Sequence, residues 1–188
     1  MGCPHSKNTS VATSVSLEPT LPNSPSTSTS PSTSTISQHA CKETNVHTIH
    51  YPEHQPRVET PLYRKTHHTL CIVQDLPCWI CGKNHKNDGV ITETHHFFCE
   101  KAAENAIDWT KFGKKAQFLY NPQTGLHLGS AFDWNAVQTT PDLFVDSCAN
   151  MIVLCPEHHR SETQGIHHVP HPEWILQSCA KDGFVFLT

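Results

Sequence analysis

Two short cysteine patterns, far apart in the chain, constrain its fold more than any other feature. The first is Cys78-x-x-Cys81 and the second is Cys155-x-x-His158. Each pattern can offer two metal ligands from a tight turn, and two such patterns together supply the four ligands of a tetrahedral structural zinc site. We therefore predict that these four side chains hold one Zn²⁺ ion with an architectural role.

The first cysteine pair can also be interpreted as a redox motif or as two core thiols. No thioredoxin-like βαβ pattern precedes Cys78, so zinc ligation is the better interpretation. The fourth ligand is open between His158 and His159, because the two histidines are adjacent and can exchange roles. The cysteines outside the two patterns lack the dense spacing of a disulfide-stapled domain, which favours a reducing compartment. They are Cys3, Cys41, Cys71, Cys99, Cys148 and Cys179.

Further polar residues accompany the two cysteine patterns. The pair His95-His96 follows the first pattern, Asn150 precedes the second, and His159 directly follows it. In this order the sequence resembles the HNH endonucleases, the ββα-metal nucleases, in a version with an added zinc clamp. The segment Gly165-Ile166-His167-His168, followed by Pro172-Glu173-Trp174, resembles a form of this family common in phage and prophage proteins. The resemblance covers roughly residues 70 to 186.

The resemblance implies a small α+β fold of the ββα-metal type, treble-clef-like, and metal-dependent hydrolysis of DNA phosphodiester bonds. It implies that His95 and His159 bind the catalytic ion and that His96 is the general base. Imidazole suits this role because its unperturbed pKa of about 6.5 leaves it largely neutral, yet basic. Asn150 would hold the catalytic loop or orient the base. A third ligand is expected from His167, with His168 and His171 as alternatives.

The catalytic ion is left open among Mg²⁺, Mn²⁺, Ni²⁺ and Zn²⁺. Imidazole ligands favour the last three, whereas Mg²⁺ prefers oxygen ligands. The expected partner is double-stranded DNA. The net charge of −4, with His counted as neutral, excludes binding through bulk positive charge, so contacts with phosphate must be local. Candidate donors are Lys111, Lys114, Lys115 and Arg160. The sequence leaves the oligomeric state, the target and the mode of cleavage open.

Each of these roles has a simpler alternative. A chain with 16 histidines produces adjacent pairs by chance, as it does at His67-His68. Asn150 can serve as a turn or helix cap. The main alternative function is a non-catalytic zinc module that binds nucleic acid or protein, and such a module would have no need of His96. A more remote alternative is a membrane-tethered adaptor, because the first six residues match the pattern for N-myristoylation at Gly2.

Composition divides the chain into three parts. Residues 1–45 form a tail rich in Ser, Thr and Pro that buries too little apolar surface to fold, so we expect disorder. Residues 46–68 lack a sustained hydrophobic period and are expected to be a linker, and residues 69–188 form the nuclease-like domain. No apolar run reaches the length of a membrane span, and no signal peptide is evident. We expect a protein of the cytoplasm, in a bacterium or a phage-infected cell.

Hydrophobic patterns predict the elements of the domain. We expect strands over 69–73, 90–98 and 184–187, and helices over 100–112, 156–163 and 172–181. The apolar segment 151–154 is expected to return the chain to the second cysteine pattern. The interval 114–141 is expected to be an inserted loop with short elements. Along strand 90–98, His95 and His96 must point to opposite faces. Glu93 can tune His95 from behind, but a solvated strand carboxylate is the commoner case. We expect large aromatic side chains to fill the core. These are Phe97, Phe98, Trp109, Trp134 and Trp174.

Overall fold

The computed structural model describes residues 51–52, 58–171 and 174. The chain divides into two units, Met1–Asn45 and Val46–Thr188, and all described residues lie in the second. The expectations for the tail, for helix 172–181 and for strand 184–187 fall outside the described residues. Within the described part, no helix is both long enough and apolar enough to cross a membrane. The expected α+β class is confirmed, since helices surround a pair of strands.

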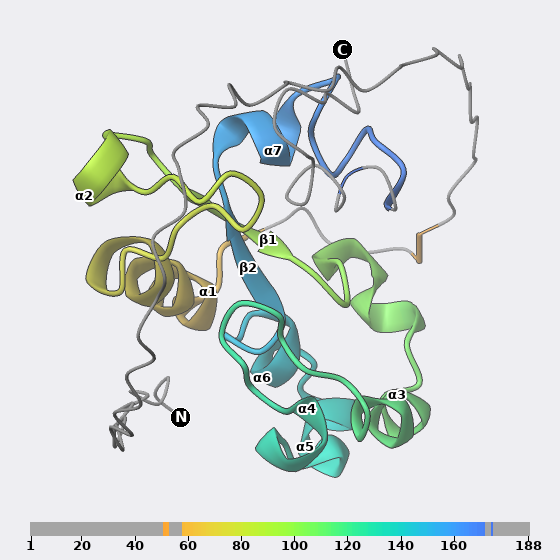
Figure 1. Ribbon diagram of the computed structural model, residues 1–188. Coiled ribbons are helices and arrows are strands. Elements are labelled where there is room, and N and C mark those ends of the chain that lie inside the picture. Colours follow the sequence, from red (N-terminus) through yellow and green to blue (C-terminus); the bar gives the residue numbers. More distant parts are fainter. Residues whose placement is uncertain (1–50, 53–57, 172–173, 175–188) are drawn as a thin grey trace, which may run out of the picture. The chain divides into compact units, whose positions relative to one another are not determined.

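The strand pair consists of β1 (Glu93–His96) and β2 (Met151–Leu154), which run antiparallel at the centre of Figure 1. Glu93 pairs with Leu154 and His96 pairs with Met151. Every residue of β2 is fully buried, which explains why this strand is apolar throughout and does not alternate. The strand expected over 90–98 is therefore present, although it is shorter than predicted, and the apolar segment 151–154 forms its partner strand.

Two segments attach directly to β2 and carry the cysteine patterns. Helix α7 (Pro156–Arg160) begins immediately after the strand, with Pro156 at its first position as predicted. The turn that contains the first cysteine pair docks on the strand through the Trp79 N–H, which donates to the Val153 carbonyl at 2.9 Å. In this turn Gly82 has a φ of 72°, a left-handed conformation that favours glycine. Both cysteine patterns are thus fixed to the same strand.

A helical layer fills the interval between the strands. It comprises η2 (Lys101–Ala106), α3 (Trp109–Ala116), α4 (Leu128–Ala131), α5 (Trp134–Thr139) and α6 (Asp142–Val145). The continuous helix expected over 100–112 is wrong, because a 3₁₀ helix ends at Ala106 and Asp108 then caps a new helix by accepting from the Lys111 N–H. The expected loop 114–141 contains α4 and α5, which pack against α3.

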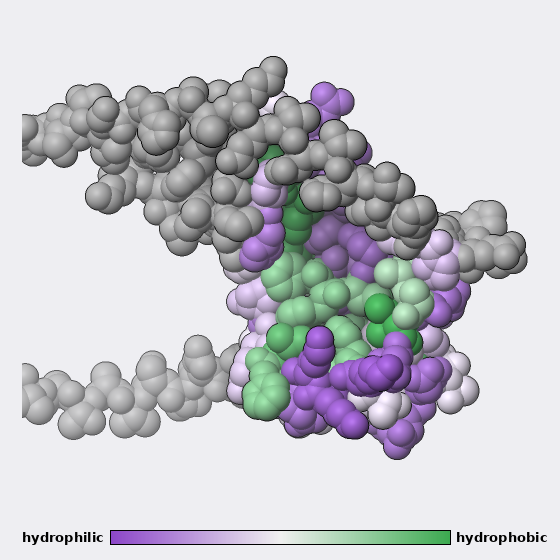
Figure 2. All heavy atoms as spheres, turned by 90° about the vertical axis from the view of Figure 1, so that its right-hand side faces the viewer, coloured by the Kyte–Doolittle hydropathy of each residue, from purple (hydrophilic) through white to green (hydrophobic). Residues whose placement is uncertain are grey.

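The core of this layer is aromatic. Phe144, fully buried, contacts the rings of Trp109, Phe112 and Trp134 with centroid separations of 5.3–5.8 Å. Partly buried apolar residues pack around it. Figure 2, which views the right-hand side of Figure 1, shows apolar residues in the middle of that face and strongly polar residues along its lower edge. The aromatic residues predicted for the core therefore have that role.

The segment before the first cysteine pattern differs from expectation. Helix α1 (Pro61–His67) continues into a π-helix, η1 (His68–Val73), where the sequence predicted a strand. The burial pattern fits a helix and not a strand. Leu70 and Cys71 are both buried, whereas Ile72 and Val73 are both exposed. In a strand, neighbouring residues would point to opposite faces. The described end of the expected linker therefore forms a helix of the domain.

Asn150 links the two strands at one end of the pair, where β1 ends and β2 begins. Its side-chain oxygen accepts from the backbone N–H groups of Phe98 and Cys99 at 2.9 and 3.0 Å. Its amide nitrogen donates to the carbonyls of Cys99 and Val145 at 2.9 and 2.8 Å. Asn150 is fully buried, and three of these four hydrogen bonds are buried as well, so their backbone groups lack a solvent substitute. Asn150 thus holds the loop after β1.

Substitution of Asn150 by alanine should therefore destabilise the domain strongly. The change leaves buried donors and acceptors unpaired, and we expect a loss of at least about 2 kcal/mol in the free energy of unfolding. Urea denaturation at a fixed zinc concentration measures it. Asn135→Ala, at an exposed position in α5, is the matched control and should leave the midpoint nearly unchanged. An Asn150→Ala midpoint equal to that of the control would contradict this assignment.

Candidate metal centres

The predicted cysteine-histidine site is assembled in the structure. One ligand atom from each of Cys78, Cys81, Cys155 and His158 lies within 4.8 Å of all the others. Cys155 Sγ lies 3.1 Å from His158 Nδ1, Cys78 Sγ lies 3.7 Å from it, and the Sγ atoms of Cys81 and Cys155 are 3.9 Å apart. A tetrahedral zinc ion with ordinary bond lengths separates its sulfur and nitrogen ligands by about 3.5–3.8 Å. The three sulfurs and one nitrogen therefore fit a structural zinc ion.

The geometry chooses His158 over His159 as the fourth member. His158 is buried beside the cysteines, and burial lowers its pKa, which keeps the imidazole neutral and able to bind a metal. Trp174 covers it, since the indole N–H donates to the His158 carbonyl at 3.0 Å. Burial also raises the pKa of the Cys78 thiol to about 12 without a metal, and a bound Zn²⁺ reverses this preference by stabilising the thiolate.

A second cluster consists of His95, His159 and His167, whose ligand atoms also lie within 4.8 Å of one another. The rings are close: the centroid separations are 4.9 Å for His95–His167, 5.1 Å for His159–His167 and 5.3 Å for His95–His159. The first residue comes from β1, the second from α7 and the third from the segment after α7. Among the described histidines near this end, His167 joins the cluster, whereas the alternatives His168 and His171 do not.

Two imidazoles of this cluster have lowered pKa values. Burial, followed by the nearby charges of His159 and His167, lowers the pKa of His95 to about 3. Burial also lowers the pKa of His159, although its hydrogen bond with Glu93 opposes the shift. Neutral imidazole is the form that ligates metals. His95 and His159 therefore offer lone pairs, not positive charges, at physiological pH.

Glu93 orients His159, so it is neither a partner of His95 nor a solvated carboxylate, the two interpretations that the sequence offered. Its Oε2 atom lies 2.7 Å from His159 Nδ1 and 2.9 Å from Arg160 Nε, and its Oε1 atom lies 2.6 Å from an Arg160 terminal nitrogen. The strand register explains this, because Glu93 pairs with Leu154, just before α7. A carboxylate accepts from Nδ1–H, so Nε2 of His159 is left for a metal.

His96 lies on the opposite face of β1 from His95, as predicted, and does not belong to the cluster. Its Nε2 atom lies 3.1 Å from Asp146 Oδ1, and its Nδ1 atom lies 4.0 Å from Glu100 Oε2. The other oxygen of Glu100 lies 3.7 Å from His95 Nε2. One carboxylate, 41% exposed, therefore lies near a ring nitrogen of each histidine, at separations longer than a hydrogen bond.

Asp146 is a functional candidate that the sequence did not indicate. Burial raises its pKa, but hydrogen bonds from His96 and Thr60 outweigh burial and hold its pKa below the ordinary value. The carboxylate is therefore ionised at neutral pH. Tertiary folding brings Asp146 next to His96, and no local sequence pattern links the two positions.

The N-cap of α1 could have been found in the sequence. Thr is a favoured N-cap residue and Pro a favoured first helical residue, so Thr60-Pro61 indicates the start of a helix.

The candidate phosphate donors lie in two places. Lys111, Lys114 and Lys115 are exposed on α3, where Lys111 pairs with Asp108 at 3.1 Å. Arg160 is 63% exposed, with its guanidinium bound to Glu93 next to the histidine cluster.

Among the remaining cysteines, Cys71 and Cys99 are free and buried, whereas Cys148 takes part in a disulfide bond. The expectation of reduced cysteines thus does not hold for Cys148.

The chain matches no protein-family model, no curated protein and no solved structure. Any inference about its function therefore rests on the chemistry of its own side chains.

Loss of one cysteine ligand should abolish the first centre. We expect Cys155→Ala to lose the thiolate-to-metal charge-transfer absorption of the Co²⁺-loaded protein, and with it the folded near-ultraviolet circular dichroism, because structural metal sites contribute directly to folding. Cys71→Ala, which removes a buried thiol outside the cluster, is the control and should keep the cobalt spectrum. A Cys155→Ala spectrum like that of the control would show that these residues do not bind the ion.

Removal of the Glu93 carboxylate should weaken the second centre selectively. Glu93→Gln should lower the affinity of the zinc-loaded protein for Ni²⁺ or Mn²⁺ by about 10–100-fold, as is typical for a partner that orients a ligating histidine. Isothermal titration calorimetry measures this affinity. Glu157→Gln changes an exposed carboxylate on α7, the helix that carries His159, and should have little effect. Equal affinities in the two variants would mean that Glu93 does not serve the histidine cluster.

Proposed function

We propose that this chain is a metal-dependent endonuclease that hydrolyses phosphodiester bonds in DNA, as its resemblance to the HNH nucleases implies. The observation that carries the proposal is the convergence of His95, His159 and His167 beside a histidine of different environment, His96. A cluster of neutral imidazoles suits a divalent ion, and a separate imidazole held by a carboxylate suits a general base. Metal ligation and proton abstraction require different residues, and the adjacent strand residues His95 and His96 supply one for each.

His96 would act as the base through Nδ1. In this role Nδ1 takes a proton from the water that attacks phosphorus in line with the leaving 3′ oxygen. The P–O3′ bond breaks and the 3′ oxygen takes a proton from solvent, which gives a 5′-phosphate and a 3′-hydroxyl. A divalent ion held by the histidine cluster would supply Lewis-acid stabilisation of the charge that develops on the phosphate. Arg160, exposed beside His159, offers a further positive charge for a phosphate oxygen.

The ligands narrow the choice of the ion. Three imidazoles favour Zn²⁺, Ni²⁺ or Mn²⁺, whereas Mg²⁺ prefers oxygen and keeps most of its water. The Glu100 carboxylate near His95 adds an oxygen atom to the surroundings of the cluster, which broadens this choice towards Mn²⁺. An assay with Mg²⁺ alone would therefore underestimate the cleavage activity.

A second candidate function is a zinc-stabilised binding module without catalysis. It is favoured by the burial of His96, whose side chain is 4% exposed, and by the net charge of −4. A base must reach water, and a nuclease must approach a polyanion. The two functions differ in their need for His96, because a binding module keeps its affinity for DNA when this residue is replaced.

Cleavage of supercoiled plasmid by the zinc-loaded protein, with Mg²⁺, Mn²⁺, Ni²⁺ or Zn²⁺ added separately, tests the proposal. We expect nicking that depends on the added ion and falls by at least about 100-fold in His96→Ala and in His95→Ala. His85→Ala, at an exposed position in α2 (His85–Asp88), is the control and should cut like the wild type. A parallel single-stranded RNA substrate establishes whether DNA is preferred.

Two results would contradict the proposal. Folded, zinc-loaded wild type that cuts no substrate with any ion would favour the binding module, and DNA affinity would then be measured directly. Undiminished cutting by a folded His96→Ala variant would instead remove the general base from the mechanism. Circular dichroism and zinc content establish for each variant that the fold is retained.

A further inference from the structure

We propose that Asp146 is a positioning residue for His96 and that helix α1 holds Asp146 in place. In this arrangement Asp146 fixes the imidazole tautomer with the proton on Nε2, so that Nδ1 is left as the acceptor. The inference deepens the proposed nuclease function and rests on it for its catalytic consequence. It assigns a role to residues 60–67, which lie outside the segment that resembles the HNH nucleases.

The contact between Asp146 and His96 is short and shielded from solvent. Asp146 Oδ1 lies 3.1 Å from His96 Nε2, and the two side chains are 3% and 4% exposed. An ionised carboxylate can only accept hydrogen bonds, so the shared proton belongs to His96 Nε2. A neutral imidazole has one donor and one acceptor nitrogen, and Nδ1 must then be the acceptor. The geometry therefore selects one of two tautomers.

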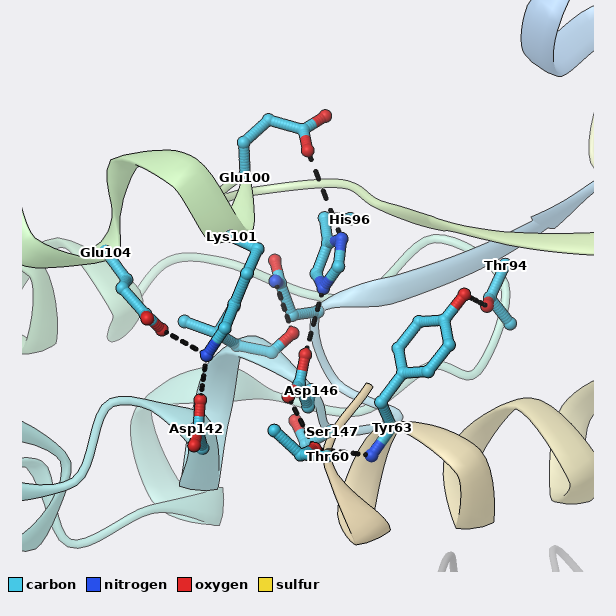
Figure 3. A network of polar contacts seen from close by, with 12 residues as sticks. Thr60, Tyr63, Thr94, His96, Glu100, Lys101, Glu104, Asp142, Asp146 and Ser147 are labelled. Carbon is cyan, nitrogen blue, oxygen red and sulfur yellow. Dashed lines mark hydrogen bonds and ion pairs between the residues drawn. The ribbon is translucent and has the colours of Figure 1, made fainter. Parts of the chain in front are cut away.

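Helix α1 fixes the other side of the carboxylate. Thr60, its N-cap residue, donates from Oγ1 to Asp146 Oδ2 at 2.7 Å, while the same oxygen accepts from the Tyr63 N–H at 2.9 Å. Each carboxylate oxygen thus has its own donor. Figure 3 shows His96 between Glu100 and Asp146, with Thr60 on the far side of Asp146. Rotation of the Asp146 carboxylate would break both contacts together.

The same helix also supports the ring of His96. The Tyr63 ring stacks on it with a centroid separation of 6.0 Å and an interplanar angle of 25°. The Tyr63 hydroxyl accepts from Thr94 Oγ1 at 3.3 Å, and Thr94 lies two residues before His96 on β1 (Figure 3). Residues of α1 therefore contact the imidazole, its carboxylate partner and its strand. A helix with only a packing role would not need this set of polar contacts.

The nitrogen that remains free faces a different environment. His96 Nδ1 lies 4.0 Å from Glu100 Oε2, too far for a hydrogen bond but close enough for one water molecule to be shared. Glu100 is the more exposed of the two carboxylates that flank His96. His96 thus has a buried carboxylate at Nε2 and a more exposed carboxylate near Nδ1.

The cost of losing such orientation is known in general terms. In a hydrolase whose histidine base is held by an aspartate, Asp→Asn lowers turnover by about 10⁴-fold because the amide permits the wrong tautomer. Asp146→Asn preserves the shape of the side chain, yet its NH₂ group can donate to Nε2. We therefore expect turnover to fall by about 10²–10⁴-fold with the Michaelis constant almost unchanged. Thr60→Val, which frees one carboxylate oxygen, should lower turnover by roughly 10-fold.

Nitrogen-15 NMR of the imidazole rings in the full-length, zinc-loaded protein measures the tautomer independently of activity, with the His96 signals assigned through His96→Gln. The wild type should have a protonated Nε2 and a bare Nδ1. In Asp146→Asn the signals should move towards the opposite tautomer or an average of the two. Asp88→Asn, on the exposed helix α2, and Thr139→Val, on α5, are controls that should keep the wild-type signals.

The two readouts separate this inference from the nuclease proposal. An unchanged Nε2–H tautomer in folded Asp146→Asn, with turnover within about threefold of wild type, would overturn the positioning role while the nuclease stands. If the wild type cuts no nucleic acid, the nuclease proposal fails and the NMR signals alone decide whether Asp146 orients His96. If Asp146→Asn does not fold, Thr60→Val decides by the same two measurements.

Discussion

The position of helix α7 is the constraint on which both metal clusters depend. Cys155 and His158 close the first cluster with Cys78 and Cys81, and they fix the helix at the end of β2. Successive residues on a helix are about 100° apart around its axis, so His159 must point elsewhere. It points at His95, because β1 pairs with β2 in a register that brings Glu93 next to Leu154. A structural centre therefore determines the geometry of its neighbour.

Two carboxylates then distinguish the histidines by environment. Glu93 holds His159 through Nδ1, which leaves Nε2 for an ion, and Asp146 holds His96 through Nε2, which leaves Nδ1 free. Hydrogen bonds of this type set which imidazole nitrogen is available, and they do so without contact with a substrate. Chemically identical side chains thus have different hydrogen-bonding environments.

The sequence predicted the members of the two candidate metal clusters better than the residues that support them. Two short patterns identified the cysteines, and strand alternation separated His95 from His96, because both signals are local. The partner of Glu93, the choice of His158 over His159 and the contact of Asp146 with His96 depend on tertiary packing, and no local period contains them. The apolar run 70–73 was misleading because π-helical burial places Leu70 and Cys71 together. Thr60-Pro61 indicates the start of helix α1, but a search for hydrophobic periods does not detect capping residues.

Anomalous diffraction from crystals of the zinc protein, soaked in Ni²⁺ or Mn²⁺, tests the central claim that one helix serves two different ions. The account predicts a zinc peak among Cys78, Cys81, Cys155 and His158, and a separate peak of the soaked ion bounded by the second cluster. That cluster comprises His95, His159 and His167. A zinc peak alone, with no ion among the three histidines at saturating concentration, would contradict the account and its proposed chemistry together.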